Sequence, residues 1–514
     1  MTLPAVSFGR GRDLLRSVQP PRDALPALVV FAVLVGLAFE NGGFFPRAWT
    51  AAAVALLWVA ALTLLLAARV ALTVLECAWL ALLGGFLAWT ELSGVWSLSH
   101  AESLLELRRG LVYLAGLVAV LLLARRRSVA DLLTGVWAAV TVVVLYALVR
   151  YLFESKVHSD EYQATLLFRP LGYANGVGIF ASLGAILAFA LALRASRRLQ
   201  RTLAAASIAP LVAAVQLTGS RASELAICVG LAVMLVVDHN RLQLFGGLLV
   251  VLPAAAAVVA LSAHSRLTEQ TNVGAPAERQ AHSLALWILV AAVALAVARP
   301  AAEKAGHALA RRSFLRRGVP VAAGVAAVTF VAALVASGWT KTFFSTGARP
   351  TYWRVAWHEY LAHPWLGSGA GTFGDYWTRY GDPALEGGAL DAHNLYLETL
   401  AEVGPVGLVL LVAMLALPLV VAITARAHPF VPAATGAYVA FLAHAALDWD
   451  WELPAVTLAG LVCAAAIMVA GRDRAQPWVL SARVRGVLLI GTLGLAVFVV
   501  VAQLVHGGGG DRFP

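Results

Sequence analysis

The sequence predicts an all-α fold: a polytopic transmembrane helical bundle of about 12–15 spans with a large outward-facing loop that contains amphipathic helices. Of the 514 residues, 61% are hydrophobic and only 13% are charged, whereas a soluble domain has about 25% charged residues. Apolar runs of about 20 residues, the length that a helix needs to cross a bilayer, recur along the whole chain. Such unbroken runs exclude a transmembrane β-barrel, whose strands alternate in polarity.

The apolar runs define the expected helices in chain order. We place them near residues 25–40, 48–68, 70–90, 110–124, 129–150, 171–193, 202–217, 222–238, 241–261, 284–298, 319–337, 403–424, 432–447, 453–470 and 486–504. The two closely spaced pairs, 48–68 with 70–90 and 202–217 with 222–238, leave open that one member is a broken or re-entrant helix. Residues 91–109 are amphipathic, which suits a helix lying in the outer membrane interface.

These helices divide the chain into five segments. They are a cytoplasmic basic tail (1–24), N-terminal transmembrane helices (25–337), a large periplasmic or extracellular loop that carries the most informative motifs (338–402), C-terminal transmembrane helices (403–504) and a flexible tail (505–514). No cleavable signal pattern precedes the first helix, so this helix is expected to be an uncleaved anchor.

The charge distribution predicts the orientation in the cell (inner) membrane. With the N-terminus in the cytoplasm, about 24 Lys and Arg residues fall inside and about 14 outside, as the positive-inside rule requires. The formal net charge of +10 is then mainly a topology signal, and no nucleic-acid partner is expected. The inner basic loops favour anionic membrane lipids.

Neither a metal nor another cofactor is expected. The three cysteines, Cys77, Cys228 and Cys463, lie far apart within apolar helices and suggest neither a disulfide framework nor a CxxC metal motif. On the outer side, the nearest candidates for metal ligands are Asp391 and the acidic residues of the sequence DWDW at 448–451. We interpret the DWDW acids as contacts to an acceptor or partner, or as a solvated turn.

Arg221 is the first candidate binding residue. It lies in the sequence TGSRAS between two apolar helices joined by very few residues, and a charge held at such a position is costly and usually functional. The N-terminus of the following helix would add backbone N–H groups and a favourable dipole for an anion. The alternatives are a snorkelling cation or an ion-pair partner of Glu224.

Arg349 is the second candidate, at the start of a probable helix that ends near Pro364. The spacing of Arg349, Trp353, Ala356, Trp357 and Tyr360 predicts that they share one helix face. Tryptophan rings suit stacking on a sugar, although an aromatic belt at the membrane surface explains them equally well. The glycines that follow Pro364, at positions 367, 369 and 371, predict a loop whose backbone can approach a ligand closely.

His393 is the candidate catalytic residue. It is followed by Asn394 and an apolar helix that carries Glu398 and Glu402. A histidine with an ordinary pKa near 6.5 is a usable general base at neutral pH. Asn394 can cap the helix or hold a hydroxyl, and the two glutamates can orient a cation. Taken alone, a histidine at a helix start is more often structural.

These motifs together resemble the superfamily of O-antigen ligases and polymerases, membrane proteins of the bacterial envelope. The resemblance, over roughly residues 90–470, rests on three patterns: TGSRAS at 218–223; Arg349 and Trp353 followed by Pro364, Gly367, Gly369 and Phe373; and His393, Asn394, Tyr396, Leu397, Glu398, Glu402, Gly404 and Gly407. Weaker matches are Trp96-Ser97 and RPLGYANGVG, with Gly172 and Asn175.

The resemblance implies a donor in which a glycan is linked to undecaprenyl diphosphate. Arg221 and Arg349 would then bind the diphosphate, and His393 would deprotonate the acceptor hydroxyl in an inverting, metal-independent transfer. Trp353, Asn394 and Glu398 are weaker candidates for contacts with the glycan or acceptor. The acceptor could be lipid A core, a polysaccharide or a protein. The resemblance does not separate ligase from polymerase.

Two other classes remain open from sequence. A transporter of lipid-linked glycans would show pseudo-symmetric halves and broken helices near the membrane midplane, whereas the polar motifs here are concentrated on one face. Glu76 is the clearest acid expected deep within a span. A non-catalytic envelope scaffold would retain glycan output after replacement of His393 or Arg349.

Overall fold

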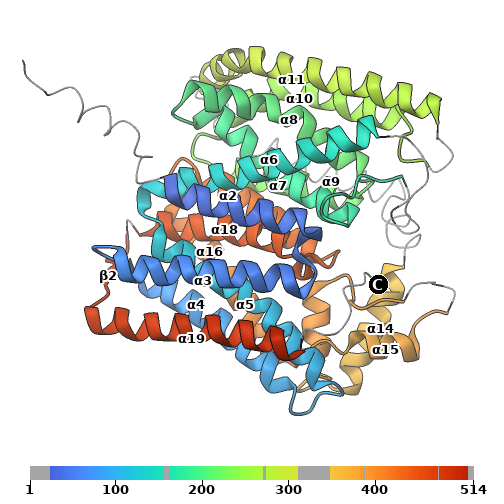
Figure 1. Cartoon of the computed structure of the whole chain (residues 1–514). Coiled ribbons are helices and arrows are strands. Elements are labelled where there is room, and N and C mark those ends of the chain that lie inside the picture. Colours follow the sequence, from blue (N-terminus) through green and yellow to red (C-terminus); the bar gives the residue numbers. More distant parts are fainter. Residues whose placement is uncertain are drawn as a thin grey trace, which may run out of the picture.

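The computed structural model is a bundle of long helices that run roughly side by side (Figure 1). It describes residues 24–154, 163, 165–269, 274–310, 348–383, 385, 388–472 and 474–506. The α-helices are α2 (Ala24–Phe39), α3 (Pro46–Leu66), α4 (Val74–Ser93), α5 (His100–Leu123), α6 (Val129–Phe153), α7 (Ala174–Arg194), α8 (Arg198–Leu217), α9 (Arg221–Val237), α10 (Arg241–His264), α11 (Ala275–Ala310), α14 (Arg349–Ala362), α15 (Phe373–Tyr380), α16 (Leu395–Ala425), α17 (Val431–Ala445), α18 (Pro454–Gly471) and α19 (Ala482–His506). The remaining elements are the 3-10 turns η1 (Asn41–Gly43), η2 (Arg126–Ser128) and η3 (Asp450–Glu452), and the strands β1 (Ala71–Leu72) and β2 (Trp478–Val479).

The structure confirms a polytopic helical membrane fold. In the described part of the chain, nine helices are long and apolar enough to cross a membrane, and two shorter apolar helices, α2 and α17, accompany them. Each predicted helix that falls there has a counterpart, and the closely spaced pairs are complete separate helices. The predicted helix at 319–337, the basic tail up to residue 23 and the tail from residue 507 lie outside the described residues.

Three helices, α5, α11 and α16, differ clearly from their predicted bounds. Helix α11, predicted at 284–298, spans Ala275–Ala310. The amphipathic segment 91–109 is not a separate interfacial helix, because α4 continues to Ser93 and α5 already begins at His100. Ser99 caps α5 through its side chain, which accepts a hydrogen bond from Glu102 N. The polar residues of this segment therefore form the first turns of α5. Helix α16 begins before residue 403, at Leu395, and has a break at Gly404, where φ is 68°.

Helices α7 and α18 form the centre of the bundle, where almost every residue is buried. Small residues allow this close packing. At the contact between α9 and α17, a Cβ added to Gly230 would lie 2.7 Å from the carbonyl oxygen of Gly436. Helices α10 and α11 lie along one edge of the bundle and α19 along the opposite edge (Figure 1).

One end of the bundle carries α14 and α15 (Figure 1), and we call it the site end. At the opposite end, Arg472 Nε lies 2.7 Å from Glu76 Oε1, and Arg472 also donates to the carbonyl oxygens of Leu121 and Ala124 at the end of α5. Glu76 is therefore not deep within a span as predicted: it is in the first turn of α4, where it completes a capping box with Thr73.

Candidate active site

The loop between α17 and α18, which contains DWDW, is the centre of the site end. Asp448 is completely buried. Its carboxylate accepts hydrogen bonds from Tyr173 Oη and Asn175 Nδ2, both at 2.7 Å, and from Arg349 Nη2 at 2.9 Å. Asp450 is also completely buried, so the interpretation of these acids as a solvated turn is wrong. The weak sequence match at Asn175 and the motif residue Arg349 thus meet on one carboxylate.

Arg349 is the first residue of α14 and is oriented by two groups of this loop. Besides its ion pair with Asp448, its Nε donates to Leu447 O at 2.7 Å. Its side chain is 22% exposed. The loop thus fixes the direction of the guanidinium while leaving part of it accessible.

His393 lies beside the same cluster, just before α16. Its Nδ1 is 2.7 Å from Asp391 Oδ1, and its backbone N–H donates to the same oxygen at 2.9 Å. The ring stacks on Tyr352 of α14, with centroids 4.7 Å apart, and lies 6.5 Å from the ring of Trp449. His393 has a φ of 51°, a left-handed conformation that residues with a Cβ seldom adopt. Several contacts therefore fix one ring position.

The electrostatics of this cluster change the expected protonation state of His393. Burial disfavours the charged imidazolium, but the carboxylate of Asp391, aided by Asp448, favours it and raises the pKa of His393 to about 9. The pKa of Asp448 is lowered: burial opposes this, and the surrounding cations, His393 first, outweigh it. The resting cluster therefore consists of a carboxylate, an imidazolium and a guanidinium. The ordinary histidine pKa assumed from sequence does not apply here.

A buried hydrogen-bond chain lies beneath this cluster. Ser223 Oγ is 3.0 Å from His444 Nε2, and His444 Nδ1 is 2.7 Å from Asp450 Oδ2. All three residues are completely buried. Ser223 Oγ also contacts the Oγ of Ser220, the N-cap of α9, at 2.9 Å. The chain thus connects the TGSRAS turn to the DWDW loop.

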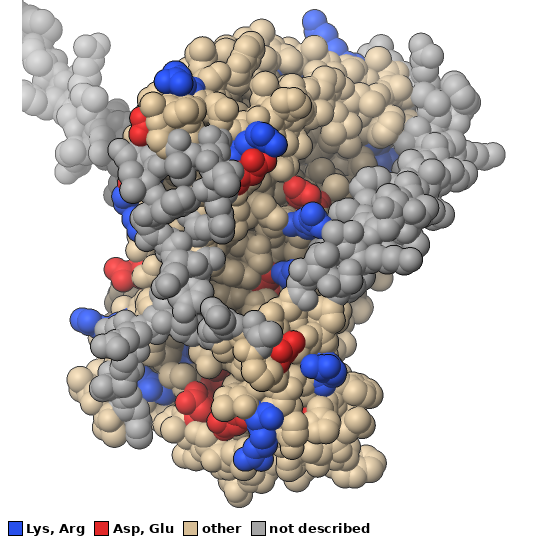
Figure 2. Space-filling model, turned by 90° about the vertical axis from the view of Figure 1, so that its right-hand side faces the viewer, with Lys and Arg blue, Asp and Glu red and all other residues tan. Residues whose placement is uncertain are grey.

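Arg221 follows Ser220 as the first residue of α9 and is exposed. In the part of the chain that the structure describes, its side chain makes no hydrogen bond or ion pair, so the predicted alternative of an ion pair with Glu224 is not formed and Arg221 is bonded to neither Arg349 nor His393. It belongs to the same end of the bundle because Ser223, two residues later, reaches α17. Figure 2, which views this end, shows basic and acidic side chains around a hollow.

The residues after His393 hold the adjoining loops. Asn394 caps α16: its Oδ1 accepts hydrogen bonds from the backbone N–H groups of Tyr396 and Leu397, at 3.1 and 3.0 Å. Glu398 accepts from Ala392 N at 2.7 Å, and this fixes the backbone immediately before the histidine. Of the two sequence alternatives for Asn394, the structure realises the helix cap.

The glycine-rich loop packs against protein backbone. Glu402 accepts hydrogen bonds from the N–H groups of Gly371 and Phe373, at 2.9 and 3.0 Å. A Cβ added to Gly367 would lie 2.2 Å from Glu402 O, and one added to Gly369 would lie 2.2 Å from Ser97. The close approach that these glycines permit is therefore made to α16 and to the segment before α5.

Because α14 is one continuous α-helix, the five residues from Arg349 to Tyr360 share a face as predicted, but this face is not the one that packs most closely against the protein. The buried face of α14 consists of Val355, Ala356 and Glu359, which together with Tyr352 pack toward α15 and α16. Trp353 is half-buried and Trp357 is 49% exposed. Aromatic residues of α15 supply the apolar surface against which the buried face packs.

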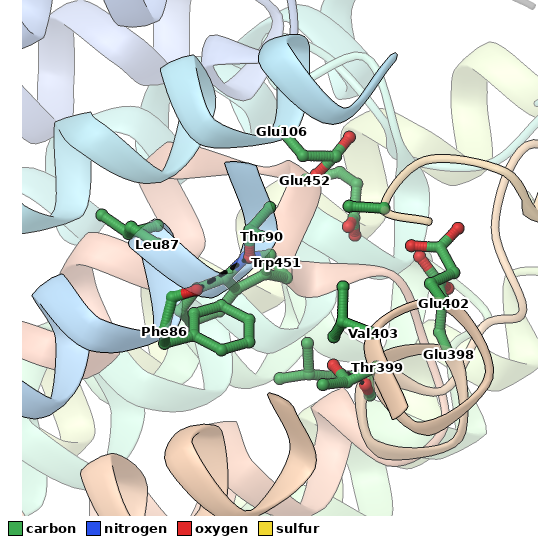
Figure 3. Close-up of a pocket in the computed structure, with 12 residues that line it drawn as sticks. Phe86, Leu87, Thr90, Glu106, Glu398, Thr399, Glu402, Val403, Trp451 and Glu452 are labelled. Carbon is green, nitrogen blue, oxygen red and sulfur yellow. Dashed lines mark hydrogen bonds between the residues drawn. The ribbon is translucent and has the colours of Figure 1, made fainter. Parts of the chain in front are cut away.

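A small pocket next to the histidine loop is lined by four glutamates, Glu106, Glu398, Glu402 and Glu452, with Thr90, Thr399 and Trp451 (Figure 3). Arg109 forms an ion pair with Glu106 and lies 3.7 Å from Glu452. Burial raises the pKa of Glu452 to about 8, so this side chain can donate as well as accept a hydrogen bond. Within the described residues, no group of three or more His, Cys, Asp and Glu side chains is arranged to hold a metal ion.

Sequence reasoning named the two arginines and the histidine but not the residues that orient them. Asp448 was noted only as a possible contact, and Tyr173 and His444 were not singled out. The sequence signal for them was a concentration of polar residues at one helix end, because DWDW begins four residues after His444. Periodicity cannot show that this turn faces inward.

In a comparison with known protein families, the family described as O-Antigen ligase matches residues 206–412 of the chain. The matched span runs from α8 into α16 and includes Arg221, Arg349 and His393, but it ends before the DWDW loop. No curated protein matches the chain significantly.

Proposed function

We propose that the chain, whose residues 206–412 match the O-antigen ligase family, is a membrane enzyme of this superfamily that moves a glycan from undecaprenyl diphosphate to an acceptor hydroxyl. The transfer takes place at the outer face of the cytoplasmic membrane. The alternative within the superfamily is polymerisation, in which the acceptor is a second lipid-linked glycan. The site end would face outward in both cases.

The proposed step is an inverting displacement. The acceptor oxygen forms a bond to the anomeric carbon, the bond from that carbon to the phosphate oxygen breaks, and undecaprenyl diphosphate leaves with the electron pair. The acceptor proton passes to His393. Because its pKa is raised to about 9, His393 is a strong base, but it must first lose its proton to act as one.

The observation that carries this proposal is the convergence of distant motif segments on one loop. Arg349, Asn175 and the His393 segment reach Asp448 or its neighbours, and Ser223 reaches the same loop through His444. A chain that needed only to sit in a bilayer has no use for this cluster of buried charge, because burying charge is costly.

The two arginines suit the diphosphate. A guanidinium matches phosphate oxygens with paired N–H donors, and Asp448 orients that of Arg349 in advance. Arg221 adds a positive charge at the N-terminus of α9, where the helix dipole also favours an anion. The same positive charges would stabilise the leaving diphosphate.

The glutamate pocket suits sugar hydroxyls. Carboxylates accept hydrogen bonds from hydroxyl groups, and Glu398 connects this pocket to the histidine loop through its bond to Ala392 N. Trp451 offers an apolar wall, and aromatic rings commonly pack against sugars. We assign this pocket to the glycan or the acceptor. The half-buried Trp353 remains a weaker candidate for the same contact.

The test is a transfer assay with the purified full chain and undecaprenyl-diphosphate oligosaccharide. Candidate acceptors are lipid A core, polysaccharide and protein, and the products are separated by gel and mass spectrometry. We expect His393→Ala to lower the transfer rate by about 100-fold or more, the usual contribution of a general base. His239→Ala is the control, because His239 is an exposed histidine in the turn between α9 and α10.

The products distinguish the alternatives. One transfer onto a different molecule identifies a ligase and its acceptor, and a ladder of lipid-linked oligomers identifies a polymerase. Wild-type rates for His393→Ala would exclude His393 as the base. Donor movement across reconstituted vesicles without any transfer would refute the proposal in favour of a transporter.

A further inference from the structure

The C-terminal half of α14 and the turn after it present a strip of exposed apolar side chains. The strip consists of Trp357, Leu361, Trp365 and Leu366, of which Trp365 is 80% exposed. We call it the Trp365 strip. Exposed apolar clusters of this kind usually mark a surface that contacts protein or membrane.

The break in α16 indicates the level of this strip, meaning its position along the bundle axis. Beyond Gly404, α16 continues for about 20 residues, which is about 30 Å of helix and matches the hydrocarbon core of a bilayer. A Cβ added to Gly404 would lie 2.6 Å from the carbonyl oxygen of Trp365. Trp365 therefore touches α16 at the point where its spanning part begins.

Helix α4 confirms this level independently. Near its end, Trp89 Nε1 donates to Val403 O at 2.8 Å, and closer to its start Trp79 Nε1 donates to Met414 O at 2.9 Å. The two helices thus run antiparallel in register, and α4 ends beside the break of α16. The edge of the membrane-spanning layer at this side lies near Ser93 and Gly404.

The strip is continuous with the lipid-facing surface of the bundle. On α16, the exposed side chains of Val406 and Val409 begin directly after the break. On the other side, the segment after α4 exposes Val95 and Leu98, and it touches the turn after α14 where Gly369 meets Ser97.

We propose that the Trp365 strip is embedded in the headgroup region of the bilayer, so that α14 is an interfacial helix held by lipid. Tryptophan is enriched at this depth because its ring is apolar while its indole N–H stays near water. Arg354 and His358, both exposed on α14, add a flank that suits anionic headgroups. The occupant is thus a lipid surface, and the strip extends the membrane contact of the bundle.

This docking would place Arg349, at the other end of α14, close to the level of lipid headgroups. A lipid-linked diphosphate would then meet the guanidinium without leaving the membrane surface. That consequence rests on the proposed function, whereas the docking of the strip does not. The experiment below measures docking alone, so its failure leaves the proposed function untouched.

Depth-dependent quenching tests the proposal. Cys77, Cys228 and Cys463 are replaced by alanine, and a single cysteine at Trp365 or Leu361 is labelled with an environment-sensitive fluorophore. The protein is reconstituted into vesicles of phosphatidylethanolamine and phosphatidylglycerol. Val409→Cys, exposed on α16, serves as the membrane reference, and Thr378→Cys, exposed on α15, as the reference outside the strip.

We expect nitroxide-labelled lipids to quench labels at positions 361 and 365 several-fold more strongly than the label at 378, with the nitroxide near the headgroup being the most effective. Aqueous iodide should reach position 378 but reach 361 and 365 poorly. Free access of iodide to both strip positions would overturn the proposal. Protection from iodide without lipid quenching would overturn it as well, because a protein surface such as a second copy of the chain would then cover the strip.

Discussion

The protonation state of His393 gives the sharpest test of the site, through the pH dependence of transfer. Its pKa is raised from 6.5 to about 9 by Asp391 and Asp448 against the opposing effect of burial. The difference of about 2.5 units corresponds to about 3 kcal/mol in favour of the charged imidazolium. At pH 7 only about 1% of the resting enzyme then carries a neutral His393.

If neutral His393 is the base, the transfer rate at limiting acceptor rises with pH and levels off near pH 9. Asp391→Asn is the informative variant, because the amide keeps an oxygen that can accept from the His393 N–H but removes the negative charge. The pH midpoint should move from about 9 toward 6.5, and the neutral fraction at pH 7 should increase to as much as about three quarters. The assay is initial transfer rate between pH 6 and 10, with Asp382→Asn as the exposed control.

Two results would refute this reasoning. A rate that falls as pH rises through 9 would mean that the imidazolium is the active form, as a ligand of the diphosphate or an acid, and not the base. A midpoint that is the same in wild type and in Asp391→Asn would mean that the observed titration does not belong to His393.

Further predictions follow from the same contacts. The raised pKa of His393 adds stability below pH 6.5 that is lost as pH rises through 9, so the melting temperature should fall over this range, and less so in Asp391→Asn. Arg349→Ala leaves the buried Asp448 charge without its ion-pair partner and should destabilise the protein by about 3 kcal/mol. The double variant Arg349→Ala with Asp448→Asn removes that unpaired charge, so it should recover part of the melting temperature but not the activity. Ser223→Ala, which removes the hydroxyl beside His444, should cost about 1–3 kcal/mol; an unchanged melting temperature would contradict the buried chain. Gly404→Ala should cost about 2 kcal/mol through the strained φ and the clash with Trp365 O, as measured by thermal unfolding in detergent.

The helices were predictable from sequence because bilayer thickness imposes a length and a composition on each span. The site was predictable only at its charged residues. Arginine and histidine beside apolar helices are costly enough to attract notice, whereas the partners that orient them are ordinary polar residues in short turns. Asp448 is an example, because its burial depends on Tyr173, Asn175 and Arg349 converging from three distant segments. The glycine-rich loop was expected to approach a ligand, but it packs against protein backbone. The spacing of the glycines predicts a close approach without indicating which group is approached.

The ion pairs also explain how the charged cluster can be stable in the resting protein and still respond to an anion, as the proposed function requires. Asp448 holds Arg349 and stabilises the imidazolium of His393 in the resting protein, so two cations are kept together without a bound anion. A diphosphate that arrives beside Arg349 would compete with Asp448 for the same positive charge, and it would raise the pKa of His393 further. Departure of the diphosphate would reverse that shift. Binding of the donor should therefore be accompanied by proton uptake near pH 9, which calorimetry measures as a buffer-dependent heat. This uptake should vanish in His393→Ala. The same uptake in both proteins would show that donor binding does not change the protonation of His393.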